Sequence, residues 1–74
     1  MTNETATQLA VLEGLPKVDL DLLGVDGNAF AIMGAVRRAA RRAGWTPEQS
    51  SQWTEVAQSG DYNHLLASAL AVVA

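Results

Sequence analysis

Apolar and polar residues alternate with a period of two in one short segment near the N-terminus, KVDLDL at residues 17–22. Its three apolar side chains fall on one face of an extended chain and its two aspartates on the other, as in a half-buried strand. The pattern predicts a strand over about residues 17–23. A strand needs a neighbour, and three partners remain open: residues 9–15 across a turn, residues 70–74, or the same strand of a second subunit. For residues 9–15 the pattern does not decide between a short strand and a helical turn begun at Thr5.

Apolar residues after this segment recur with the period of 3.6 that is typical of helices. A first helix is expected over about residues 29–43, with Asp26 or Asn28 as its cap and with Gly44 ending it. The side of this helix that faces the core is predicted from its apolar residues, which are Ile32, Val36, Ala39, Ala40 and Ala43.

Two further helices have clear start signals. Residues 46–49 read Thr-Pro-Glu-Gln, a capping box with proline at the first helical position, and predict a helix over about residues 47–58. Asp61 begins a mostly apolar helix over about residues 61–72, whose last turn could instead be extended. These elements predict the α+β fold class: a compact three-helix domain with one short N-terminal strand or hairpin packed on the helices.

The length of the chain sets its domain organisation. Its 74 residues suffice for one domain, predicted to cover residues 9–74, and a chain this short buries only about 60% of the surface that its unfolded form exposes. Residues 1–8 are polar and rich in threonine, which predicts a flexible N-terminal tail. The core is expected to be thin and rich in alanine, so completion by a second chain in a homodimer is one expectation.

Few residues here are suited to catalysis or metal binding. Cysteine is absent, which excludes disulfides and thiolate sites. His64 is the only histidine; no second group stands at catalytic or ligand spacing from it, and an exposed or capping histidine is expected. We therefore expect no enzyme activity and no catalytic, cofactor-binding or metal site. No apolar run approaches the roughly 18–20 residues of a membrane span, and the first residues lack the basic start of a secretory signal, so a cytoplasmic protein without a membrane partner is expected.

Charge is distributed very unevenly along the chain. Residues 37–42 read Arg-Arg-Ala-Ala-Arg-Arg and carry +4, whereas the rest holds Lys17 against eight carboxylates, a net −7. On the predicted helix the arginines lie opposite the apolar side, and an aromatic residue and Gly34 share their side. We define the interaction face as the five candidate contact residues Phe30, Arg37, Arg38, Arg41 and Arg42.

Guanidinium groups bind phosphates and carboxylates alike, so the interaction face suits either a nucleic-acid backbone or an acidic protein surface. The simpler alternative is a solvated helix end whose cations offset the helix dipole, with Phe30 packed under the strand. Residues 40–46 are also similar to the turn of helix-turn-helix proteins. However, the helix that follows holds Glu48 and Glu55 and no basic residue, which disfavours DNA reading through it.

Two sequence blocks carry a resemblance to a known group. DGNAFAIMGAV at residues 26–36, followed by the arginines, and SGDYNHLL at residues 59–66 resemble small, functionally uncharacterised proteins of bacteriophages, plasmids and other mobile elements of actinobacterial type. The resemblance covers about residues 18–73. It implies a compact fold and such a genetic setting, with no activity attached.

These observations predict a non-enzymatic phage or mobile-element accessory protein that acts by protein–protein interaction in the host-cell cytoplasm. Its partner is expected to be a host or phage protein held by the interaction face. One alternative is a nucleic-acid-binding accessory protein that contacts phosphates through the four arginines. A second alternative is a minor structural component of the virion.

Overall fold

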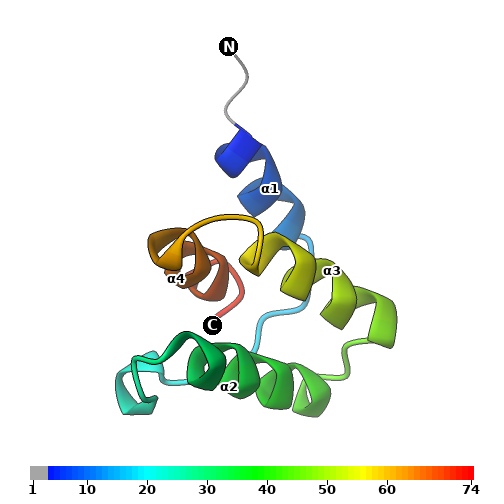
Figure 1. Ribbon diagram of the computed structural model, residues 1–74. Helices are drawn as coiled ribbons and strands as arrows, with labels where there is room; N and C mark the ends of the chain where they lie inside the picture. The colour runs from blue at the N-terminus through cyan, green and yellow to red at the C-terminus, as the bar shows by residue number, and fades with distance from the viewer. Residues whose placement is uncertain (1–3) are drawn as a thin grey trace.

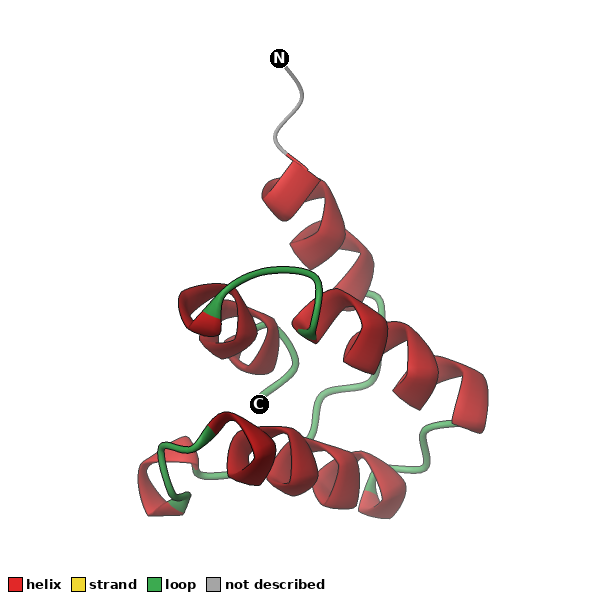
Figure 2. Cartoon of the chain, viewed as in Figure 1, coloured by secondary structure: helices red, strands yellow, loops and turns green. Residues whose placement is uncertain are grey.

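The computed structural model describes residues 4–74, with side chains from Gln8 onward, and this part of the chain is helical (Figures 1 and 2). Helix α4 packs against each of the other three α-helices, so it forms the centre of the molecule. Helix α1 contacts α3 as well, and α2 contacts α3. The elements are α1 (Glu4–Leu12), the short 3-10 helix η1 (Leu22–Gly24), α2 (Ala29–Arg42), α3 (Pro47–Ala57) and α4 (Tyr62–Leu70).

The core is built from small residues on the helices and a few large side chains between them. Trp53 of α3 is fully buried, and its Nε1 donates a hydrogen bond of 2.9 Å to the backbone carbonyl of Ser68 in α4. The small core residues are the buried alanines of α2, α3 and α4, which are Ala39, Ala40, Ala57 and Ala69. The cluster comprises Leu12, Leu15, Val18, Ile32, Val36, Ala39, Ala40, Trp45, Trp53, Ala57, Leu65, Ala69 and Val72.

Side chains that cap the helices explain where α2, α3 and α4 begin. The Asn28 side chain accepts from the Phe30 amide, and Asp61 does the same for the His64 amide. At α3 the predicted capping box is present: the Thr46 side chain accepts from the Gln49 amide, and the Gln49 side chain accepts from the Thr46 amide. These bonds satisfy amides that the first turn of a helix leaves free.

The α+β prediction is wrong, because the described part of the chain contains four α-helices and no sheet. The segment predicted as a strand, residues 17–23, is extended around Val18 and forms one isolated parallel bridge, between Val18 and Val73. The Val18 amide donates to the Val72 carbonyl over 2.8 Å. Among the three open partners, the structure therefore selects residues 70–74.

The extended segment ends where Asp21 accepts a hydrogen bond from the Leu23 amide and caps η1. The alternation of residues 17–22 thus reflects burial of Val18 with partial burial of Leu20 and Leu22, without a ladder of backbone partners. At the N-terminus, residues 1–3 of the predicted tail lie outside the described residues, and residues 4–8 form the start of α1.

Candidate functional site

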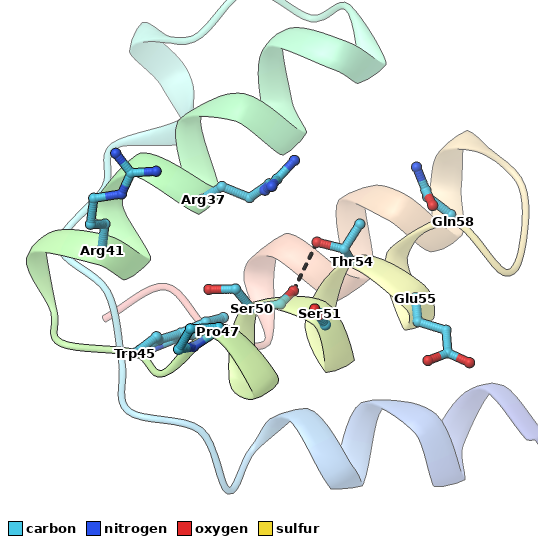
Figure 3. A pocket seen from close by; sticks show the side chains of 9 residues that line it. All are labelled: Arg37, Arg41, Trp45, Pro47, Ser50, Ser51, Thr54, Glu55 and Gln58. Carbon is cyan, nitrogen blue, oxygen red and sulfur yellow. Dashed lines mark hydrogen bonds between the residues drawn. The ribbon is translucent and has the colours of Figure 1, made fainter.

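All four arginines of the interaction face are exposed, on the side of α2 that turns away from the core. Arg37 and Arg41 lie one helical turn apart and border a groove between α2 and α3 (Figure 3). Arg38 and Arg42 project further round the helix. The guanidinium of Arg38 folds back along α2 towards Gly34. Its Nη1 lies 3.3 Å from the position that a Cβ on Gly34 would occupy. The helix thus presents its cations over a wide arc.

The groove between α2 and α3 has a volume of about 670 Å³, and its lining is polar and apolar in nearly equal parts. Glu55 is the one carboxylate in this lining, and its side chain points away from both arginines (Figure 3). Guanidinium and hydroxyl groups that line one groove can donate several hydrogen bonds to a carboxylate or a phosphate. The lining residues are Arg37, Arg41, Trp45, Pro47, Ser50, Ser51, Thr54, Glu55 and Gln58.

Phe30 does not pack under the extended segment: its side chain is 80% exposed at the start of α2. It borders a second, more apolar hollow of about 350 Å³, whose floor includes the buried side chains of Ala57 and Leu65. Gln58 lines both this hollow and the arginine-lined groove, so the two depressions adjoin. The remaining residues around the hollow are Ala29, Met33, Gly60, Asp61 and Tyr62.

The two sequence blocks that carry the family resemblance meet in space at this hollow. The hydroxyl of Tyr62, from the second block, donates a hydrogen bond to the Gly27 carbonyl of the first. Within the first block, the Asp26 side chain accepts from the Asn28 amide over 2.9 Å, which shapes the turn that leads into α2. The blocks therefore fix the junction between the starts of α2 and α4.

His64 lies inside this junction, so of the two expectations, an exposed or a capping histidine, exposure is wrong, and the ring instead contacts the carbonyl of Val56 in the last turn of α3. Its side chain is buried, and Nε2 lies 2.8 Å from the Val56 carbonyl and 3.2 Å from the Ser59 hydroxyl. Because a carbonyl oxygen only accepts, Nε2 carries the proton. The ring also lies against Gly60, where a Cβ would approach the His64 Cβ to 2.8 Å. This histidine ties the end of α3 to the start of α4.

The sequence did not predict that two further apolar side chains, Leu23 and Tyr62, are exposed. Leu23 in η1 is 96% exposed and Tyr62 is 44% exposed. The only sequence signal for the hollow is the i, i+3 spacing of Phe30 and Met33 on one helix. The contribution of Tyr62 depends on how α4 packs against α2, which no local pattern reveals.

Comparisons with protein-family models, with curated proteins and with solved structures find no match to this chain. Within the described residues, no three histidine, aspartate or glutamate side chains are placed to share a metal ion. No helix in that part of the chain has the length and apolar character to cross a membrane.

Proposed function

We propose that this protein is a non-enzymatic accessory protein of a phage or mobile element, and that it acts by binding another protein through the interaction face. The observation that carries the proposal is the 80% exposed Phe30 next to four exposed arginines on one helix. The genetic setting rests on the resemblance of residues 26–36 and 59–66. The partner is a host or phage protein encountered in the host-cell cytoplasm.

The physical basis is the free energy that a partner gains by covering this face. Burying an exposed phenylalanine side chain contributes about 1.5–3 kcal/mol, and aromatic residues with arginine are enriched in protein interfaces. A window of +4 beside the groove favours a partner with carboxylates. The groove and the hollow adjoin at Gln58, so one partner surface can contact Arg37, Arg41 and the hollow together.

His64 has a structural role in this proposal. Its ring nitrogen Nε2 donates a hydrogen bond to the Val56 carbonyl and lies 3.2 Å from the Ser59 hydroxyl in a buried position, where it stabilises the junction between two helices. The interaction face itself contains only arginines and Phe30, which bind but do not exchange protons near neutral pH.

The experiment is a pull-down with the tagged chain from cells that carry the element, comparing wild type with an Arg37→Gln, Arg41→Gln double variant. We expect loss of the recovered partner from the variant, with an unchanged circular dichroism spectrum. A matched control, Ala10→Glu with Gln52→Glu, changes net charge by the same amount at exposed positions of α1 and α3 and should retain the partner. Equal recovery by both variants would contradict the proposal.

A nucleic-acid-binding function is the second candidate, because Arg37 and Arg41 line the same groove as Ser50 and Ser51 of α3 and could hold phosphate oxygens there. Against it, α3 adds Glu48 and Glu55, and the whole chain has a net charge of −3. Gel-shift assays with DNA and RNA at physiological salt test it directly. Absence of a shift at micromolar protein would eliminate this candidate, and a shift lost in the arginine double variant would favour it.

A further inference from the structure

The groove and the hollow adjoin at Gln58 and together form one trough along α2 and α3. The two ends of this trough differ in chemistry. At its apolar end, the hollow, Phe30 and Met33 of α2 supply apolar surface. At its basic end, the groove, Arg37 and Arg41 of α2 lie in the same lining as the hydroxyl groups of α3. A ligand that is complementary to both ends therefore combines an apolar group with an anion.

Arg37 is the arginine of the groove that lies nearer to the apolar end. Its side chain extends in the direction of Thr54 and Gln58, whereas Arg41 points away from α3 (Figure 3). Glu55, the one carboxylate in the groove lining, points away from Arg37 (Figure 3). The Arg37 guanidinium is thus directed to the place that a ligand would cross between the two ends, and a guanidinium binds a carboxylate through two parallel hydrogen bonds.

The charges around the trough separate a peptide from a nucleic acid as its ligand. Glu48 and Glu55 line a further depression on α3, which shares Ser51 with the groove. Asp61 borders the hollow at the other end of the trough. A nucleic-acid strand carries a phosphate on every nucleotide, so it would bring negative charge against these carboxylates. A peptide can place a single carboxylate at Arg37 and present apolar side chains elsewhere.

From this charge complementarity and the apolar hollow, we propose that the partner docks through an acidic peptide segment, with one carboxylate on Arg37 and a large apolar side chain in the hollow. Met33 and Phe30 precede Arg37 by four and seven residues, which is about 6 Å and about 10 Å along the helix axis. Two or three residues of an extended segment span this distance, or four to seven of a helical one. This inference rests on the proposed function, because it specifies the chemistry of the partner at the same face.

Selection of random dodecapeptides, displayed on phage, against the immobilised full chain tests this chemistry. We expect the enriched peptides to combine aspartate or glutamate with a large apolar residue. Arg37→Glu should instead enrich lysine or arginine in place of the acid. Arg42→Glu makes the same charge change at a residue that lines neither depression, and it should keep the acidic preference. Both side chains are exposed, so circular dichroism should match the wild type.

Three results of the selection would overturn the inference: enrichment of no peptide, enrichment without this combination, or loss of the acidic preference in both variants. The last would show that net charge, and not Arg37, sets the preference.

Fluorescence anisotropy with one enriched, labelled peptide tests where each group binds. Changing the acidic residue of the peptide to lysine should weaken binding to the wild type by about tenfold or more and restore binding to Arg37→Glu. Phe30→Ser, at a side chain that is 80% exposed, should weaken the parent peptide but not a peptide whose large apolar residue is alanine. No recovery in the exchanged charge pair, or an equal effect of Phe30→Ser on both peptides, would overturn the placement.

Other occupants of the trough give different results with the same variant. A wild-type chain that sediments as a dimer, with Arg37→Glu as a monomer, would assign the trough to a second copy. A gel shift that Arg37→Glu loses would assign it to a nucleic acid, and either result would overturn the peptide inference. If the selection shows no acidic preference, yet the wild type captures a protein that the arginine double variant loses, only this inference fails and the proposed function stands.

Discussion

Gly60 lies directly against the ring of His64, and its contacts leave no room for a side chain. A Cβ at this position would lie 2.8 Å from both Cβ and Cγ of His64. The ring cannot move away without breaking its hydrogen bonds to the Val56 carbonyl and Ser59. We expect Gly60→Ala to lower the free energy of unfolding by about 1–3 kcal/mol, the usual cost of overpacking, as measured by urea denaturation.

Gly24→Ala is the matched control, because a Cβ on Gly24 would meet nothing within 4 Å. Its effect should stay within about 0.5 kcal/mol. In a His64→Gly background, Gly60→Ala should cost much less than in wild type, since the clashing Cβ and ring are both gone. Equal costs of Gly60→Ala in the two backgrounds would show that the His64 side chain is not the cause.

The two tryptophans are both buried, and each donates a hydrogen bond to a backbone carbonyl, but the two acceptor residues differ in exposure. Trp53 is fully buried and donates to the Ser68 carbonyl, whereas Trp45 is 8% exposed and donates to the carbonyl of the exposed Pro16. Trp53→Phe leaves a buried carbonyl without its partner and removes core volume, so we expect a loss of roughly 2 kcal/mol or more. Trp45→Phe should cost less, because water can reach Pro16. Thermal unfolding of both variants makes the comparison, and a larger loss for Trp45→Phe would contradict it.

At the scale of elements, capping residues and apolar periodicity in the sequence were enough to predict three helices. They were not enough to predict the structure of the N-terminal third of the chain. Helices α2, α3 and α4 begin beside the caps Asn28, Thr46 and Asp61, where the sequence placed them. The alternation of residues 17–22 was misleading, because it reports which side chains are buried and not whether the backbone has partners. The structure of residues 9–15 was left open between a helical turn and a short strand, because their apolar residues span too few turns to show a period, and the structure places residues up to Leu12 in α1.

The candidate site also has one part that the sequence predicted and one part that it did not. Exposure of the four arginines follows from the helical period, since the opposite side of α2 is filled by core residues. The hollow beside Phe30 could not be derived from the sequence, because it requires α4 to bring Tyr62 next to Gly27. The sequence therefore predicted that the arginines are exposed and that Phe30 lies on their side of the helix, and tertiary packing created the hollow beside Phe30.

The capping box at the start of α3 permits a prediction for an entire helix. Thr46 accepts from the Gln49 amide over 3.2 Å, and Gln49 Oε1 accepts from the Thr46 amide over 2.8 Å. Thr46→Ala removes one of these bonds and should lower the free energy of unfolding by about 1 kcal/mol. Gln52→Ala, at an exposed position inside α3, is the control and should be close to neutral. Urea denaturation gives both values, and equal effects of the two substitutions would argue against the cap.

At the scale of the whole molecule, the segment between α1 and α2 is held against the end of the chain. The Val18 amide donates to the Val72 carbonyl and the Ala74 amide donates to the Val18 carbonyl, over 2.8 and 2.9 Å. Lys17 Nζ adds a bond of 2.6 Å to the Ala71 carbonyl. These contacts join residues more than fifty positions apart, so they form only when the helices have packed.

Val18 is the hydrophobic anchor of this closure, because its side chain is fully buried while the backbone on either side of it bonds to the C-terminal residues. Val18→Ala deletes two buried methyl groups, each of which contributes about 1 kcal/mol to stability. We therefore expect the free energy of unfolding to fall by about 2 kcal/mol. Val11→Ala removes the same atoms from a side chain that is 46% exposed on α1 and should cost far less. Urea denaturation compares the two. If residues 16–21 contributed little to the core, both substitutions would have the same small effect; a large difference would show that the extended segment stabilises the helical fold through the burial of Val18.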